Sequence, residues 1–565
     1  MVTPGQRPAA RNRRRRRLLT RVGPVAAVAV AAFVIGIVAG TAPGRAEKRM
    51  VTNYVNAWAR GDYGQMYSLL DSSSRRQTSR DQFQAAYRGA ATTATMVGVR
   101  PGRIGDRQGD VIPVTMKVRT RVFGTITAPL RLPISGSGSG AHVKFAPQVV
   151  FPGLQAGEQL GRHMSLAPRA DLLAADGTPL ARGPSRSSPI PDVASQIVGT
   201  LAPIARPQAP AYAALGYPPD AKVGQTGLER AFQDRLAGTP GGTLTAGART
   251  LANTSPAPGQ NVTTTIRPAI ERAAVKAMGA RYAGIAVMDP RTGGLLALAG
   301  VAFSALQPPG STMKIITATG ALDAGIVKLS DTFPIRTSVY VGGFDLQNAG
   351  GEACGGTLLN AFAVSCNSVF APLGAKLGAE RFVNIAQRFG FNEPSPIPGA
   401  AVSTIPSAKR IGGALDVGTS AIGQGQVQAT ALEMTEAGAT IAMGGRRPIP
   451  TLLANQPPRF VYVTTRRVAN LVQRMMIAVI QYGTGTPAQI SGVQVAGKTG
   501  TAELRSTQGP GGSSSPSNTD SWFVGYAPVG APRYVVGALF PEQGAGAQTA
   551  APAVRDVLAA ALHAG

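Results

Sequence analysis

The sequence predicts a multidomain α+β protein that is held to a membrane by a single N-terminal helix. Three observations support this prediction. The chain has 565 residues, which is enough for about three or four domains. It carries one long apolar stretch without charges near its start. Beyond that stretch, segments with apolar residues at helical spacing give way to segments in which apolar and polar residues alternate.

The apolar stretch at residues 22–44 is predicted to be a transmembrane anchor. Its 23 residues contain no charge and are long enough to cross a bilayer. A block of arginines, Arg11 and Arg13 to Arg17, precedes it. Positive residues stay on the cytoplasmic side, so we expect residues 1–21 to be a basic cytoplasmic tail. The protein would then be a single-pass protein of the cell membrane with the bulk of the chain extracytoplasmic. A cleaved signal peptide is the alternative.

The composition narrows the classes of partner and site. Lys and Arg number 56 against 28 Asp and Glu, which leaves a net charge of +28. Aromatic residues are only 5% of the chain, and no aromatic and basic platform for bases is visible, so we expect no nucleic-acid partner. An anionic cell envelope fits the charge better. With 3 His and 2 Cys, neither a metal site nor a Ser-His-Asp triad is expected, and no cofactor is implied.

Residues 45–155 are predicted to form a small α+β domain. Val51, Tyr54, Val55 and Trp58 recur at helical spacing, which predicts a first helix. A second helix is predicted in SRDQFQAAYRGAA, and strands are predicted in DVIPVTMKVRTRVFGTITAPLRLPI. We interpret this domain as a spacer without chemistry of its own.

Two further regions complete the predicted organisation. Residues 156–245 are predicted to form a β-rich region, because alternating apolar residues lead to an Asp-Gly turn at 176–177. Residues 240–262 are expected to be loop or linker. The last domain, residues 260–565, opens with two predicted strands around a turn at Pro290 to Gly294.

Three short strings carry the candidate chemistry. In PPGSTMKIITATGAL, Ser311 stands where a helix would begin, and Lys314 follows one helical turn later, so their side chains share a face. A lysine amine shielded from water can take the proton of a serine hydroxyl. Alone, the string is more simply an N-capping serine beside a solvated lysine.

The other two strings change that judgement. Ser365 and Asn367 stand in AFAVSCNSVF, where alone they could be helix caps. The third string, in VAGKTGTAEL, consists of Lys498, Thr499, Gly500 and Thr501. The order S-x-x-K, S-x-N, K-T-G is a set with a defined acyl-transfer mechanism.

With this set the chain resembles the penicillin-binding proteins and the serine β-lactamases. The segments AVMDPRTGGLLALAG, IGQGQVQATALEM, YGTGTPA and DSWFVGYAP resemble the transpeptidase domain of class B penicillin-binding proteins, an antiparallel sheet flanked by helices. That resemblance covers residues 260–565 closely. Gly224 to Glu229 and Phe232 resemble part of the pedestal, or dimerisation-like domain, of these proteins, and residues 45–155 resemble their nuclear-transport-factor-2-like domain. The Ala, Arg and Gly usage suggests a high-GC bacterium, and the chain resembles the actinobacterial type of these penicillin-binding proteins.

The resemblance implies a peptidoglycan D,D-transpeptidase that cross-links stem peptides through a serine acyl-enzyme and is acylated by β-lactams. Ser311 would be the nucleophile and Lys314 its base. Ser365 and Asn367 would be further catalytic residues, on the opposite side of the site. The implied substrate-binding residues are Lys498, which supplies positive field, Thr499 and Thr501, which hold the terminal carboxylate, and Gly500, which leaves room for close approach. Backbone N–H groups of Ser311 and Thr501 would form the oxyanion hole.

The same resemblance implies partners. These are peptidoglycan stem peptides, lipid-linked precursor strands, β-lactams, and a glycosyltransferase of the division or elongation machinery, because no glycosyltransferase module is recognised in the chain. Cys354 and Cys366 form a possible disulfide that would fix the loop carrying Ser365 and Asn367, since disulfides are permitted outside the membrane. Two free buried thiols are the alternative.

Four rival functions remain open or are disfavoured. A β-lactamase shares the acyl-enzyme, but no E-x-x-L-N string with a deacylating glutamate lies between Asn367 and Lys498. A D,D-carboxypeptidase, and a non-enzymatic wall-synthesis scaffold or β-lactam sensor, stay open. A nucleotide-binding P-loop is matched by Gly492 to Thr499, but Val493 and Val495 alternate like a strand and a Gly/Ser/Pro loop follows instead of a helix.

Overall fold

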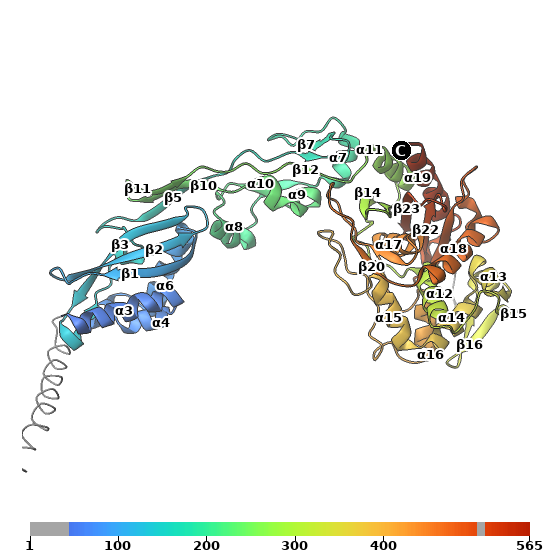
Figure 1. Cartoon of the computed structure of the whole chain (residues 1–565), viewed down its shortest axis with the longest axis horizontal. Coiled ribbons are helices and arrows are strands. Elements are labelled where there is room, and N and C mark those ends of the chain that lie inside the picture. Colours follow the sequence, from blue (N-terminus) through green and yellow to red (C-terminus); the bar gives the residue numbers. More distant parts are fainter. Residues whose placement is uncertain (1–43, 506–514, 565) are drawn as a thin grey trace, which may run out of the picture. The chain divides into compact units, whose positions relative to one another are not determined.

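The computed structural model describes residues 44–505 and 515–564, which form two compact units (Figure 1). The first unit contains the chain up to Ala167 with Pro203–Ala221 and Gly238–Pro258. The second contains Pro168–Ala202, Lys222–Ala237 and the chain from Gly259 onward. The predicted tail and residues 22–43 of the predicted anchor lie outside the described residues. Within the described ranges, no helix is both long and apolar enough to cross a membrane.

The helices of the N-terminal domain confirm the predicted pattern. Helix α3, Arg45–Arg60, buries Val51, Tyr54, Val55 and Trp58 and ends at Gly61. Gly61 has a φ of 72°, a left-handed conformation that glycine adopts without a Cβ penalty. The other helices are α4 (Tyr63–Ser68), α5 (Ser72–Gln77) and α6 (Arg80–Thr93). Helix α6 is the predicted second helix, and Ser79 with Gln82 closes a capping box at its start.

A twisted antiparallel sheet packs against these helices. Its strand order is β1-β2-β3-β4, with bounds Met96–Ile104, Val111–Thr120, Thr125–Ser135 and His142–Val143. On β2, Ile112, Val114, Met116 and Val118 are buried while the residues between them are more exposed, as period-two alternation predicts. Strands β2 and β3 were predicted, whereas β1 was not, because Pro101 and two glycines interrupt its apolar alternation.

The prediction that residues 240–262 form a loop is wrong for most of the segment. Strands β10 (Gly241–Ala246) and β11 (Arg249–Thr254) form an antiparallel hairpin, and β10 also pairs with β5 (Leu160–Ser165). Leu244 and Ala246 are the only apolar side chains on the buried face of β10. Threonine and glycine fill the other positions, so the segment has the composition of a loop, and its strand conformation depends on pairing with a distant partner.

The second unit begins with a pedestal that is organised around Glu229. Its carboxylate, 1% exposed, accepts hydrogen bonds from Nε of Arg169 at 2.7 Å and Nε of Arg186 at 2.6 Å. The predicted Asp-Gly turn is confirmed, because Gly177 has a φ of 83° between β6 and β7. The helices of this region are α7 (Pro191–Ile197), α9 (Gly227–Ala231) and α10 (Gln233–Ala237), and its strands are β6 (Leu172–Leu173), β7 (Pro179–Ala181), β8 (Leu201–Pro203), β9 (Lys222–Gly224) and β12 (Val262–Thr263).

The C-terminal domain contains a five-stranded antiparallel sheet of order β14-β13-β23-β22-β21. The predicted hairpin forms β13 (Gly284–Asp289) and β14 (Gly294–Gly300), and the other strands are β21 (Ala496–Glu503), β22 (Thr519–Ala527) and β23 (Tyr534–Phe540). Ser521 of β22 bonds to the start of α19, whereas Val524 faces Gly438 of α17. Because odd and even positions face opposite sides, α19 and α17 cover opposite faces. Strand β21 is an edge of this sheet.

Helices cover both faces of the sheet and form a second, mostly helical subdomain (Figure 1). Those next to the sheet are α11 (Pro268–Met278), α17 (Ala431–Ala442), α18 (Arg466–Gln481) and α19 (Ala550–Ala564). Those of the subdomain are α12 (Lys314–Asp323), α13 (Leu358–Ala363), α14 (Asn367–Leu377), α15 (Ala379–Phe389) and α16 (Ala414–Ala421). Small strand pairs complete it: β15 (Thr332–Arg336) with β18 (Cys354–Thr357), β16 (Ser338–Val341) with β17 (Phe344–Gln347), and β19 (Arg446–Pro448) with β20 (Phe460–Tyr462).

The Glu229 cluster generates a stability prediction. Glu229→Gln leaves two largely buried guanidinium groups without their counter-charge, which typically costs about 3–5 kcal/mol. We expect faster amide hydrogen exchange in residues 168–202 and 222–237. The control is Glu158→Gln, which removes an exposed pair with Arg249 and should leave exchange in the pedestal unchanged. Equal exchange in the pedestal of the wild-type chain and the Glu229 variant would contradict the assignment.

Candidate active site

Ser311 lies in a single 3₁₀ turn, Gly310–Met313, that runs directly into α12. The turn is clamped between two segments. The Gly310 N–H donates to the Gly423 carbonyl at 2.9 Å, and a Cβ on Gly310 would come within 2.7 Å of the Thr501 carbonyl oxygen. Gly310 also has a φ of 52°, so only glycine fits here without strain. Ser311 is half-buried, and its hydroxyl makes no hydrogen bond to any described residue, so it is free to meet a substrate.

Lys314 is the first residue of α12, and its side chain is completely buried. Its Nζ donates to the Ser365 carbonyl at 2.6 Å and to Oδ1 of Asn367 at 2.7 Å, and it lies 3.3 Å from Oγ of Ser365. Burial, and then the charge of Lys498, lowers the pKa of Lys314 well below its usual value of 10.5. A neutral amine has two N–H bonds and one lone pair. Two strong acceptors use the N–H bonds, so the lone pair is left to accept a hydroxyl proton.

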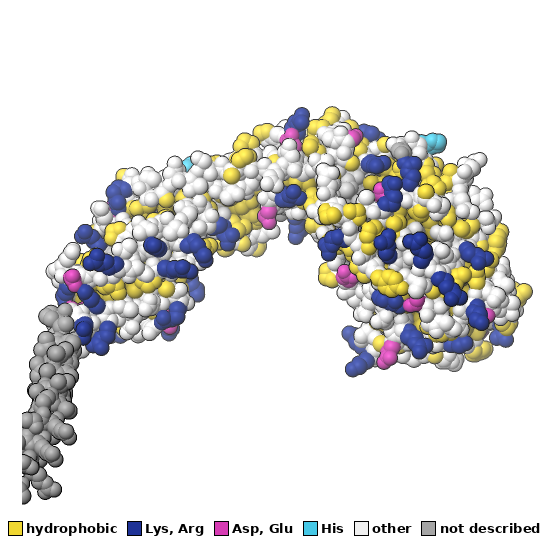
Figure 2. All heavy atoms as spheres, viewed as in Figure 1, with side chains coloured by type: hydrophobic (Ala, Val, Ile, Leu, Met, Phe, Trp, Pro, Cys, Tyr) yellow, Lys and Arg dark blue, Asp and Glu magenta, His cyan; other side chains and the backbone are white. Residues whose placement is uncertain are grey.

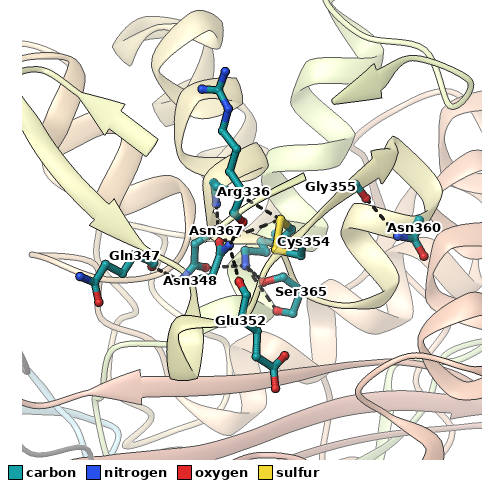
Figure 3. The surroundings of a disulfide bond; sticks show 12 residues. Arg336, Gln347, Asn348, Glu352, Cys354, Gly355, Asn360, Ser365 and Asn367 are labelled. Atoms are coloured by element: carbon teal, nitrogen blue, oxygen red, sulfur yellow. Dashed lines mark hydrogen bonds between the residues drawn. A yellow bond between two sulfur atoms is a disulfide. The ribbon is translucent and has the colours of Figure 1, made fainter. Parts of the chain in front are cut away.

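Ser365 and Asn367 occupy the sharp turn between α13 and α14 (Figure 3). Ser365 has a φ of 62°, a left-handed conformation that is uncommon for a serine and that recurs at functional sites. The N-cap position of α14 is taken by Cys366, and Asn367 is the first helical residue. The alternative that Ser365 and Asn367 are merely helix caps is therefore wrong. The turn instead directs their polar atoms at Lys314.

A disulfide joins Cys354 of β18 to Cys366 beside this turn (Figure 3). Asn348 supports the same turn from another segment: its Oδ1 accepts the N–H of Ser368 at 2.8 Å, and its Nδ2 donates to the carbonyls of Arg336 and Glu352 at 2.8 and 2.9 Å. Asn348 is 6% exposed. Sequence reasoning missed it, because an isolated asparagine in a glycine-rich stretch gives no signal of its long-range partner.

Lys498 reaches the site from the edge strand β21 and is also completely buried. Its Nζ donates to Oγ of Ser365 at 2.8 Å and to the Thr499 carbonyl at 3.0 Å. Burial lowers the pKa of Lys498 to about 7. Neither Lys498 nor Lys314 forms an ion pair with any described Asp or Glu. Two amines thus converge on one serine hydroxyl without a counter-charge, so a bound anion would stabilise the cationic form of Lys498.

The other residues of the K-T-G string pack against neighbouring segments or hydrogen-bond to them. A Cβ on Gly500 would lie 2.8 Å from the Pro309 carbonyl oxygen, so the space expected for substrate is occupied by the turn that carries Ser311. Thr499 Oγ1 shares a 2.5 Å hydrogen bond with Thr484, and Thr501 Oγ1 accepts the Gly546 N–H at 3.1 Å. Thr484 was not predicted as a site residue, although it lies in the segment YGTGTPA.

The outer edge of β21 is available for a further strand. The side-chain amide of Gln424 lies beside the backbone of Glu503 at the end of β21, and in the orientation that satisfies both groups it accepts from the Glu503 N–H at 3.0 Å and donates to the Glu503 carbonyl at 3.3 Å. This contact marks where such a strand would stop. Extended peptides commonly bind by adding to an exposed sheet edge. Lys498 and Thr499 lie within β21, and no helix follows them directly, so this segment lacks the strand-to-helix geometry of a P-loop. Within residues 44–505 and 515–564, no cluster of three His, Cys, Asp or Glu could hold a metal.

A free serine beside a buried lysine whose pKa is lowered by burial, with a second buried lysine that could bind an anion, defines a serine acyl-transfer enzyme. Comparison with known proteins gives the family. Residues 283–559 match the model of the penicillin binding protein transpeptidase domain. Residues 167–264 match the penicillin-binding protein dimerisation domain, and residues 46–158 match the NTF2-like N-terminal transpeptidase domain.

Individual relatives agree. The chain is 30% identical over 370 residues to the peptidoglycan D,D-transpeptidase PbpA of Mycolicibacterium smegmatis, covering 54% of this chain and 73% of the relative. It is 31% identical over 377 residues to PbpA of Mycobacterium tuberculosis, covering 54% and 73%. A solved ceftriaxone acyl-enzyme complex of penicillin-binding protein A from M. tuberculosis is similar, with a TM-score of 0.57, 26% identity, and coverage of 70% of this chain and 98% of that one.

The chain belongs to the penicillin-binding protein transpeptidases. Within them it is a class B protein with an NTF2-like N-terminal domain and a dimerisation domain, as the sequence indicated.

Asn348 generates a prediction about site geometry. Asn348→Ala removes the acceptor for Ser368 and frees the turn that carries Ser365 and Asn367. We expect acylation by a fluorescent penicillin to slow by about 10- to 100-fold, the range that displacement of a catalytic group produces. The control is Asn360→Ala, which removes a bond to Gly355 on the same subdomain (Figure 3) and should change acylation little. Equal rates for both variants would show that Asn348 does not position the turn.

Lys498 generates a pH prediction. Its side chain is cationic below a pKa of about 7 and loses its charge as the pH rises through that value. The second-order rate of acylation by a carboxylate-bearing penicillin should therefore fall above about pH 7. Arginine keeps its charge through this range, so the decline should be absent in Lys498→Arg, whatever its absolute rate. A decline of the same size in that variant would assign it to another group.

Proposed function

We propose that Ser311 of this D,D-transpeptidase attacks the penultimate peptide carbonyl of a stem peptide that ends in D-alanyl-D-alanine. The observation that carries the proposal is the convergence of Lys314 and Lys498 on Ser365, next to a free Ser311 hydroxyl. The stem peptide would extend along the edge of β21. Its terminal carboxylate is the anion that the two uncompensated amines lack.

The geometry supports a simple sequence of proton transfers. Lys314 accepts the Ser311 proton as the Ser311 oxygen bonds to the carbonyl carbon. The backbone N–H groups of Ser311 and Thr501 receive the developing oxyanion, an interaction for which removal of one donor has cost about 3–4 kcal/mol. Ser365, within reach of Lys314, relays the proton to the leaving nitrogen of the terminal D-alanine. An amine of a second strand then attacks the acyl-enzyme and restores Ser311.

The site favours attack on the acyl-enzyme by an amine over rapid attack by water. No described Asp or Glu carboxylate hydrogen-bonds to Lys314, Ser365 or Lys498, so no residue stands ready to activate water as the glutamate of class A β-lactamases does. A β-lactam acyl-enzyme on Ser311 should therefore persist. The similar M. tuberculosis protein was captured as such an acyl-enzyme with ceftriaxone.

We further propose that the enzyme is a single-pass membrane protein, anchored by residues 22–44 with residues 1–21 in the cytoplasm. The uncharged apolar stretch and its preceding arginines support this topology, and the Cys354–Cys366 disulfide suits an oxidising compartment. The substrates are then stem peptides of lipid-linked precursor strands. The partner that polymerises those strands is a glycosyltransferase of the division or elongation machinery.

Covalent labelling by a fluorescent penicillin tests the function. We expect label on the wild-type chain that persists for hours, and none on Ser311→Ala, because the acyl bond forms on the Ser311 oxygen. The matched control is Ser304→Ala, an exposed serine on the same connection, which should label normally.

Purified lipid-linked substrate and a glycosyltransferase then separate the remaining functions. Cross-linked product that requires Ser311 supports the transpeptidase. Release of D-alanine without cross-links would indicate a carboxypeptidase, and label lost within seconds would indicate a β-lactamase. Label without any turnover would indicate a sensor or scaffold.

A further inference from the structure

The outer face of the N-terminal sheet carries a set of basic side chains. Strands β1 to β3 turn their apolar residues toward the helices, and the opposite face is exposed. Arg100 pairs across the strands with Lys117, and Lys117 pairs with Thr127, so these side chains share the exposed face. Arg119 and Arg131 lie on the same face, because they stand at even spacing from Lys117 and Thr127 on β2 and β3. We refer to Arg100, Lys117, Arg119 and Arg131 as the basic sheet face.

These four cations have no partner within the described part of the protein. None makes a side-chain hydrogen bond or an ion pair with a described residue, and β1, β2 and β3 contain no Asp or Glu. Like charges directly opposite each other destabilise a sheet, so the Arg100–Lys117 pair weakens the fold. Two basic residues elsewhere in the domain are neutralised, in the ion pairs Lys48–Asp106 and Arg107–Glu47. The basic sheet face is therefore suited to an anion from outside the protein.

The whole N-terminal domain has an excess of positive charge. Residues 45–165 contain 17 Lys and Arg against 7 Asp and Glu. Figure 2 shows Lys and Arg side chains spread over this domain with only isolated Asp and Glu between them. An extended anionic surface fits such a distribution better than a single small anion, because charges spread over several strands cannot all contact one small molecule.

The position of the N-terminal domain in the chain indicates which extended surface lies near it. The proposed anchor ends at residue 44, and α3 begins at Arg45 without a linker. Gly44 has a φ of 84°, a left-handed conformation that turns the chain just before the helix. Given the proposed membrane location, on which this inference depends, the domain is held against the outer surface of the membrane. An anionic lipid headgroup attracts each Lys or Arg that lies within a Debye length of it.

We propose that the basic sheet face docks on the membrane by binding anionic phospholipid headgroups. Docking sets the orientation of the N-terminal domain on the bilayer. Each cation contributes about fivefold to the ratio of docked to undocked domain, as expected for basic residues near an anionic leaflet. Raised salt weakens the docking, because exposed charges are screened beyond a Debye length.

Energy transfer in nanodiscs tests this proposal on the full chain. Thr127→Cys places a donor dye beside Lys117, and labelling is selective because the native cysteines form a disulfide. Acceptor dyes are carried on lipid headgroups. We expect stronger transfer in discs that contain phosphatidylglycerol than in phosphatidylcholine discs, and a loss of that difference at high salt. The gain should also disappear when Arg100, Lys117, Arg119 and Arg131 are all changed to Gln.

A matched variant distinguishes an effect of the basic sheet face from an effect of the total charge of the domain. Arg75, Arg76, Arg80 and Arg88 are exposed on α5 and α6, which cover the other side of the sheet, and changing them to Gln removes the same charge. Transfer should be unchanged in that variant. Equal loss in both variants, or equal transfer in both kinds of disc, would overturn the proposal. Binding of inorganic polyphosphate through the basic sheet face, without lipid-dependent transfer, would overturn it in favour of a soluble polyanion.

Separate measurements test the docking proposal and the proposed enzymatic function. Penicillin labelling of Ser311 in the same nanodiscs reports the function independently of docking. A chain that does not insert into the discs would overturn both the membrane location and the docking proposal, while leaving the labelling result intact.

Discussion

The structure of the catalytic domain depends on the burial of two lysine amines around one serine. Lys314 and Lys498 both reach Oγ of Ser365, at 3.3 and 2.8 Å, and neither has a carboxylate partner among the described residues. Burying two amines so close together is unfavourable unless at least one is neutral. That same cost supports the proposed chemistry, since it lowers the pKa of both lysines and favours an anionic ligand.

Several segments that are far apart in the sequence hold these amines in place. Helix α12 presents Lys314, the edge strand β21 presents Lys498, and the turn between α13 and α14 presents Ser365 in a left-handed conformation. The disulfide at Cys366 and the Asn348 amide fix that turn. Each group is positioned by a rigid element or a buried bond, which is the preorganisation that acyl transfer requires.

Close packing of backbone explains the glycines around the nucleophile. Gly310 and Gly500 face each other's segments, and a methyl group at either position would collide with a carbonyl oxygen. The turn that carries Ser311 is therefore pressed against the strand that carries Lys498. This contact brings the first and third catalytic strings together, and it explains why glycine is needed in the third string even where no substrate lies.

Much of this protein could be predicted from its sequence. Local signals were sufficient for α3 and for the strands β13 and β14, because spacing and residue type are properties of short segments. Ser311, Lys314 and Lys498 were singled out only by the joint order of three strings, since each string alone has a simpler structural explanation. The hairpin of β10 and β11 was not predicted, since its small polar residues are ordered only by pairing with β5. Likewise, Asn348 and Thr484 acquire roles only through partners 20 and 15 residues away. The sequence by itself identified the side chains to which we assign the proposed chemistry, whereas burial decided the direction of their pKa shifts, because desolvation exists only once distant segments have closed around them.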